Sequence, residues 1–201
     1  MRPRIGLTGG IGSGKSVVSG LLTIMGIPVY DADEQSKRLL NSSADLRSSL
    51  TDLLGPEIYR TGMLDRRLMA ELIFADTDLL RKVNAAVHPA VGRHFLDWAA
   101  MQTSSKACAI ETAILYESGF RSVVDVSLLV IAPLELRIER AMRRDGSSRQ
   151  QVEQRMSHQM SDEEKMPLAD YVIVNDDRRA VIPQLEDVLA QIESRFGLHN
   201  H

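Results

Sequence analysis

The sequence has one cysteine, no long apolar run and no excess of positive charge among its 201 residues. Cys108 has no second cysteine to pair with, so an internal disulfide is excluded, and its apolar neighbours predict a buried, unreactive thiol. No stretch approaches the roughly 18 consecutive apolar residues of a transmembrane helix, and the first residues start a strand rather than an export signal. A formal net charge of −3 gives no reason to expect nucleic acid or a membrane as a partner. We therefore expect a cytoplasmic enzyme.

A glycine-rich loop is the strongest signal in the chain. Residues 9–16 match the pattern G-x-x-x-x-G-K-[ST] and directly follow an apolar run at residues 5–8 that predicts a strand. Apolar residues then recur at helical spacing until Gly26, and a chance glycine-rich turn would lack these two flanks. In such a loop the backbone N–H groups turn toward an anionic phosphate at a helix amino terminus. The residues expected around the phosphates are Gly10, Ile11, Gly12, Ser13, Gly14, Lys15 on the β- and γ-phosphates, and Ser16 on a Mg²⁺ ion.

Two aspartates, Asp31 and Asp33, follow the next predicted strand at residues 27–30. Ligands of open α/β sheets bind at the carboxyl ends of the strands, so these carboxylates could face the same crevice as the loop, as a general base or a metal partner. The alternative is that one of them caps the helix predicted at residues 34–40, which is a common use of aspartate. With a phosphate loop in the chain, we favour the functional interpretation.

Residues 42–102 are predicted to be mostly helical, with turns near Gly55 and Gly62. A crossover between parallel strands needs only about a dozen residues, so roughly sixty helical residues indicate an inserted subdomain that binds the acceptor. Within it, Pro89 should start or kink a helix that carries Arg93. His88 either contacts a substrate phosphate or caps that local break, and the sequence does not separate the two interpretations.

A basic helix is predicted at residues 134–144. It carries Arg137, Arg140 and Arg144 on one face and is followed by a break at residues 145–148 that could act as a closing lid. Such a stripe is usually a solvated face balanced by neighbouring glutamates, but arginine forks also suit phosphate oxygens. The remaining elements are predicted as strands at 106–110, 123–132 and 169–174 and a closing helix at 182–196.

The chain resembles the dephospho-coenzyme A kinases over nearly its whole length. The resemblance rests on residues 6–16, 31–33, His88 with Pro89, residues 140–145, Arg155 with Gln159, Lys165, residues 169–173 and Asn175. One departure is the stretch at residues 113–117, where the family usually has Pro-Leu-Leu, an apolar residue and Glu; Glu117 is kept, but the local turn is expected to differ. The resemblance implies a five-stranded parallel sheet between helices, a helical acceptor-binding subdomain and a mobile lid over ATP.

The resemblance also implies an activity, which is transfer of the ATP γ-phosphate to the ribose 3′-hydroxyl of dephospho-coenzyme A. Asp33 would then orient and deprotonate the hydroxyl, while Asp31 would act on the metal through water. The other residues implied to act are Lys15 and Arg140 in catalysis, Val17, Arg144 and Asn175 at the nucleotide, and His88, Arg93 and Glu117 at the acceptor. A different small-molecule kinase would share all but the acceptor site. A GTP-dependent switch would need an Asn-Lys-x-Asp sequence, which residues 174–177 do not provide.

One phosphate-loop kinase domain is therefore expected. Its core would comprise about 1–41, 103–140 and 168–201, with the acceptor-binding insertion at about 42–102 and the lid at about 141–167. The protein is expected to be a monomer or a weak homo-oligomer, and residues 199–201 a disordered tail rather than a metal site.

Overall fold

The computed structural model describes residues 2–198 and divides the chain into two compact units. The first unit contains the chain up to Tyr30 and from Ala99 onward, and the second is Asp31–Trp98. The sequence placed the start of the helical insertion at residue 42. Leu40 explains the difference, because it is buried in the core of the second unit and its carbonyl accepts a hydrogen bond from the Tyr59 hydroxyl at 2.6 Å. The expected tail at residues 199–201 lies outside the described residues.

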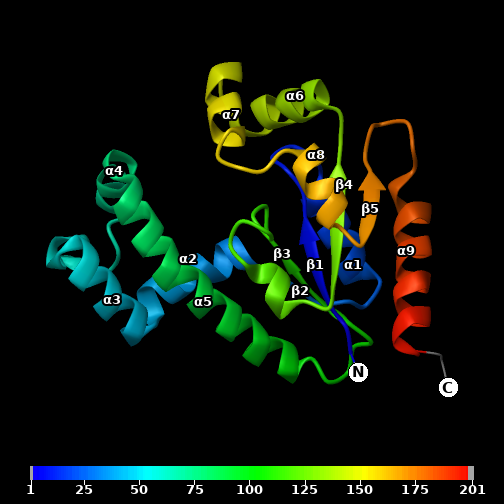
Figure 1. Ribbon diagram of the computed structural model, residues 1–201, viewed down its shortest axis with the longest axis horizontal. Helices are drawn as coiled ribbons and strands as arrows, with labels where there is room; N and C mark the ends of the chain where they lie inside the picture. Colours follow the sequence, from blue (N-terminus) through cyan, green and yellow to red (C-terminus); the bar gives the residue numbers. More distant parts are fainter. Residues whose placement is uncertain (1, 199–201) are drawn as a thin grey trace. The chain divides into compact units, whose positions relative to one another are not determined.

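A five-stranded parallel sheet forms the centre of the first unit (Figure 1). The strands are β1 (Arg4–Thr8), β2 (Val29–Asp31), β3 (Cys108–Glu111), β4 (Val126–Ile131) and β5 (Tyr171–Val174), in the order β2-β3-β1-β4-β5. β1 pairs in parallel with β3 on one side, where Ile5 is opposite Ala109, and with β4 on the other. The loop that follows Thr8 therefore leaves from the middle of the sheet at its carboxyl edge, which is where open α/β sheets bind ligands.

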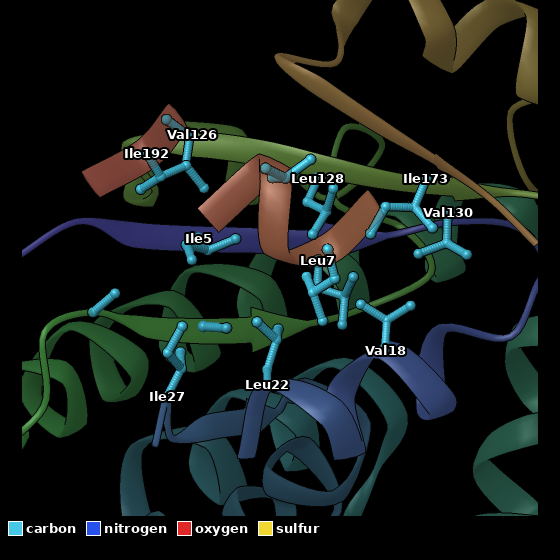
Figure 2. Packing of buried hydrophobic residues seen from close by; sticks show 14 residues of the cluster. Ile5, Leu7, Val18, Leu22, Ile27, Val126, Leu128, Val130, Ile173 and Ile192 are labelled. Carbon is cyan, nitrogen blue, oxygen red and sulfur yellow. The ribbon is translucent and has the colours of Figure 1, made fainter. Parts of the chain in front are cut away.

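Two helices cover one face of this sheet, as Figure 2 shows. Val18 and Leu22 point from α1 (Lys15–Ile24) toward the strands because residues four apart share a helix face, and Ile192 does the same from α9 (Val181–Phe196). They pack on strand residues such as Leu7 and Leu128, which are both fully buried. Each such side chain contributes about 1.5–3 kcal/mol relative to an exposed one, so this layer fixes the helix that carries the loop.

The rest of the first unit lies largely after β4. It contains η2 (Phe120–Val123), α6 (Leu134–Asp145), α7 (Arg149–Met156), α8 (Asp162–Lys165) and η3 (Met166–Leu168). α6 ends at Gly146, whose φ is 63°, and Ser148 caps α7 with a capping box, so the predicted break at residues 145–148 is confirmed. Ile138 and Val152 form a small separate core between α6 and α7.

The second unit is helical, as the sequence predicted. It contains α2 (Ala32–Ser42), α3 (Ala44–Leu54), η1 (Pro56–Tyr59), α4 (Arg66–Ala75) and most of α5 (Thr77–Met101). Its core includes Leu50, Ile58 and Val83. Across residues 2–198, no helix is both long and apolar enough to cross a membrane.

Several predicted boundaries were wrong. A helix start at Pro89 is wrong, because α5 runs through it with buried Val83 and Phe95 on either side, whereas a kink there stays a prediction. The strand predicted at residues 27–30 lies at Val29–Asp31, and the one at 106–110 lies at Cys108–Glu111. The strand predicted at 123–132 is shorter, because η2 occupies its start. The burial of Cys108 is confirmed, and burial raises the pKa of its thiol to about 11.

Candidate active site

The glycine-rich loop joins the carboxyl end of β1 to the amino end of α1. Gly14 precedes the helix with a φ of 94°, and Lys15 is the first helical residue. Lys15 Nζ donates to the backbone oxygens of Gly9 and Gly10, at 2.7 and 3.2 Å. Its charge is thus held against the loop at a helix amino terminus, where the helix dipole also favours an anion.

Two glycines of the loop are required by both conformation and space. Gly12 has a φ of 76°, and a Cβ there would lie 2.1 Å from the backbone oxygen of Arg137. A Cβ on Gly14 would lie 2.1 Å from Nδ2 of Asn175. Real Cβ atoms essentially never come this close to another heavy atom, so the loop packs directly against α6 and the residue that follows β5.

Asn175 supports the loop from the end of β5. Its backbone N–H donates to the Ile131 oxygen at 2.9 Å, and its side-chain Nδ2 donates to the Ser13 oxygen at 2.9 Å. The sequence predicted a nucleotide contact for Asn175, and the structure places it on the loop itself. Among the described residues, the hydroxyls of Thr8 and Ser13 are buried without a hydrogen-bond partner. Each can therefore still form a hydrogen bond at the base of the loop.

The three arginines of the predicted stripe on α6, Arg137, Arg140 and Arg144, have different partners. Arg137 is 8% exposed, and its Nε donates to the Ile11 oxygen at 3.0 Å while Nη1 pairs with Asp162 at 2.9 Å. Arg140 donates to the Asn175 backbone oxygen at 3.1 Å and pairs with Asp177. The interpretation of the stripe as a solvated face is therefore wrong for Arg137. The sequence did not single out Arg137 as a site residue.

Arg144 lies at the exposed end of the same helix. It forms a two-pronged pair with Asp145, at 2.7 and 3.1 Å, and Arg155 contacts the same carboxylate at 2.9 Å. Hydrogen bonds from these two arginines lower the pKa of Asp145 to about 2. Glu135, one of the glutamates that could balance a solvated stripe, instead pairs with Arg149.

The segment from Gln159 to Lys165 is attached to the rest of the unit by polar side chains. Gln159 Oε1 accepts a hydrogen bond from the Ile11 N–H at 3.1 Å. Lys165 is fully buried; its Nζ donates to the Ala113 oxygen at 2.8 Å and pairs with Glu117 at 3.1 Å. Glu117 also accepts from the Met160 N–H at 2.9 Å. Glu117, which the sequence predicted as an acceptor ligand, thus holds the segment from Gln159 to Lys165, and sequence periodicity missed this role because the partners lie far apart in the chain.

Four further predicted site residues, Asp31, Asp33, His88 and Arg93, belong to the second unit. Asp31 Oδ1 accepts from the Glu34 N–H at 2.9 Å and caps α2, so the capping alternative is confirmed for Asp31, while Asp33 lies in the first turn with an exposed side chain. His88 and the exposed Arg93 lie on α5. The helix is unbroken at His88, so there is no break for it to cap, and burial lowers the pKa of its imidazole.

The loop residues fit a Mg²⁺ ion held mainly by nucleotide phosphates. Ser16, the second residue of α1, is exposed and presents a hydroxyl at the phosphate end of the helix. Within the described part of the chain, no three His, Cys, Asp or Glu side chains form a group that could hold a metal. Mg²⁺ usually keeps several waters and takes few protein ligands beside substrate phosphates, so a single hydroxyl at the loop suits it.

Three features define the chain as a phosphate-loop kinase. They are a central parallel strand, a glycine loop that places Lys15 and Ser16 at the start of a helix, and an arginine-bearing segment after β4. The dephospho-CoA kinase family model matches residues 4–180. A dephospho-CoA kinase of Bacteroides fragilis is 47% identical over 190 residues, which cover 94% of this chain and 93% of that protein. One of Porphyromonas gingivalis is 43% identical over 195 residues, covering 95% of each. A Thermus thermophilus crystal structure has a TM-score of 0.80 and 37% identity, covering 97% of this chain and 98% of that one. The chain belongs to the dephospho-CoA kinase family, and it is an ATP-dependent kinase.

Proposed function

We propose that the chain transfers the γ-phosphate of ATP to the ribose 3′-hydroxyl of dephospho-CoA, giving CoA and ADP. The observation that supports this most strongly is the loop at residues 9–16, with glycines in close contact with α6 and with Asn175 after β5, inside a region that matches the family model. Phosphoryl transfer needs in-line positioning and neutralisation of charge on the transferred group. The loop amides and Lys15 provide positive potential at the place where a triphosphate would bind.

The arginines of α6 divide this work. Arg140 and Arg144 would bind nucleotide phosphates after exchanging their present carboxylate partners, Asp177 and Asp145, for phosphate oxygens. Ser16 would hold Mg²⁺, with Asp31 acting through water, and the bound ion would supply further charge neutralisation. Val17 and Asn175 would complete the nucleotide site, Asn175 by fixing the loop through Ser13.

The acceptor residues come from the second unit and from the loop that contains Glu117. Asp33 would orient the 3′-hydroxyl and take its proton, while His88, Arg93 and Glu117 would contact dephospho-CoA. A lowered pKa leaves His88 neutral at pH 7, so it would donate or accept a hydrogen bond rather than supply charge to a phosphate. Closure of the segment around residues 145–159 would exclude water, which otherwise competes as acceptor.

A coupled ADP-release assay tests this proposal. Purified protein with Mg²⁺ and ATP should give a kcat/KM for dephospho-CoA far above that for AMP or adenosine. Comparable values for AMP would place the chain among other small-molecule kinases of the same fold and refute the assigned acceptor. We also propose a cytoplasmic location. We further propose that the protein is a monomer or associates weakly, and size-exclusion chromatography with light scattering would check this oligomeric state.

A further inference from the structure

The peptide groups on either side of Ile11 are fixed by side chains from outside the loop. The Ile11 N–H donates to Gln159 Oε1 at 3.1 Å, and the Ile11 oxygen accepts from Arg137 Nε at 3.0 Å. On the opposite side of the first of these peptide groups, the Gly10 oxygen accepts from Lys15 Nζ and from the Ser13 N–H, both at 3.2 Å. A trans peptide points its C=O and N–H in opposite directions, so each contact orients both groups of its plane.

The contact with Arg137 therefore sets the direction of the Gly12 N–H. This N–H shares a peptide plane with the Ile11 oxygen and must point away from Arg137. If the guanidinium were lost, the Ile11–Gly12 peptide could rotate and present a carbonyl where the loop now presents a donor. A carbonyl repels phosphate, whereas the binding of an anion by such a loop depends on converging N–H groups.

Arg137 is itself held in place by Asp162 on α8. Their side chains are 9% and 11% exposed, and Nη1 lies 2.9 Å from Asp162 Oδ2. The guanidinium also fills the space over Gly10, where an added Cβ would lie 1.9 Å from Nη2. Burial raises the pKa of Asp162 despite the adjacent arginine, so the pair carries a desolvation cost, and replacing such a pair with neutral groups is often neutral for stability. A gain in stability is therefore a weak explanation for the presence of this buried ion pair.

We propose that Arg137 and Asp162 are positioning residues, which fix the Ile11–Gly12 peptide for ATP binding and couple the docking of α8 to the shape of the phosphate loop. This inference rests on the proposed function of the loop as the ATP site. Because α8 is anchored through Lys165 to Glu117 and the Ala113 oxygen, undocking of the segment that contains α8 would release Arg137 and loosen the loop. ATP affinity is thereby expected to depend on Arg137 and Asp162 through the shape of the loop.

A matched pair of double variants tests this inference. Arg137→Met with Asp162→Asn removes both charges together, and Arg4→Met with Asp125→Asn does the same to a partly buried pair at the amino end of β1, where Arg4 Nη2 lies 2.9 Å from Asp125 Oδ1. ATP dissociation constants are measured by calorimetry without acceptor, so the result does not depend on which acceptor is correct. Kinetic constants for ATP and dephospho-CoA and thermal midpoints are measured in parallel.

We expect the Arg137/Asp162 variant to weaken ATP binding at least tenfold with little change in the KM for dephospho-CoA. The Arg4/Asp125 variant should lower the thermal midpoint but keep wild-type ATP affinity. Wild-type ATP affinity in the first variant, or an equal loss in both, would overturn the inference. If the first variant does not fold, Arg137→Lys keeps a positive charge beside Asp162 but loses the Nε–H that the Ile11 oxygen accepts. It should weaken ATP binding severalfold, and unchanged binding would equally overturn the inference.

Discussion

Gly12→Ala should damage the kinase far more than it damages the fold. Gly12 has a φ of 76°, and the left-handed region costs a residue with a Cβ about 1–2 kcal/mol, partly offset by about 0.4–1 kcal/mol from a less flexible unfolded chain. The new Cβ would also lie 2.1 Å from the Arg137 backbone oxygen, where contacts under 3.0 Å essentially never occur. The loop and α6 must therefore separate by roughly 1 Å, and a misplacement of this size can cost about 10²-fold in rate.

Gly26→Ala is the matched control. Gly26 follows α1 with a φ of 81°, and an added Cβ there would meet no atom within 4 Å. It therefore carries the same backbone strain without the clash. We expect it to lose up to about 1.5 kcal/mol, or at most about 3–6 °C in thermal midpoint, with kcat and KM unchanged. Gly12→Ala should lose about 10²-fold or more in kcat/KM for ATP at a similar or moderately larger cost in stability.

The measurements are steady-state kinetics with ATP varied, together with thermal unfolding of each variant. If Gly12→Ala kept kcat and the KM for ATP within about twofold of wild type, close packing of the loop against α6 could not be a requirement for catalysis. If Gly26→Ala lost as much activity as Gly12→Ala, backbone strain rather than the contact with Arg137 would be the cause.

Four further variants test individual roles. Lys15→Ala should lose most activity with little change in thermal midpoint, and a collapse of both would make the lysine structural. Asp33→Asn should lower kcat by about 10²–10⁴-fold with little change in the substrate dissociation constants, and a kcat near that of the wild type would refute Asp33 as the general base. Asp31→Asn, which keeps a good helix cap, should mainly raise the Mg²⁺ requirement. Burial lowers the pKa of His88, so as the pH drops below about 6.5 the unfolded chain is protonated at this residue before the folded chain, and stability falls. His88→Gln should therefore weaken the pH dependence of the thermal midpoint between about pH 7 and 5. An unchanged pH dependence would exclude His88 as its cause.

The parts of the site that the sequence predicted correctly are those whose chemistry is local. A strand, a glycine loop and a helix with apolar residues four apart are written in consecutive residues, and β1, the loop and α1 lie where they were predicted. The break after α6 was equally visible, because Gly146 and Ser148 end one helix and start the next. The cap at Asp31 was foreseen as an alternative for the same reason.

Pro89 shows where local rules fail. Proline removes an N–H and usually breaks a helix, yet α5 continues from Thr77 to Met101. Ala85, whose carbonyl loses its helical partner, is exposed, so water can satisfy it. Val91 and Phe95 are buried beyond the proline, and their burial favours a continuous helix. The exposure of Ala85 and the burial of Val91 and Phe95 together allow the helix to continue, and both are properties of the folded unit.

The arginines of α6 show the same limit at the site itself. Their spacing places them on one face, but spacing cannot distinguish an arginine that binds phosphate from one that positions the loop. The partners of each arginine make this distinction. Arg137 is buried, and its guanidinium is already bonded to the Ile11 oxygen and to Asp162. Asp177, the partner of Arg140, is 65% exposed, and an exposed pair is worth only about 0–1 kcal/mol. A triphosphate can displace such a carboxylate at small cost, so Arg140 remains available to ATP while Arg137 holds the loop that receives it.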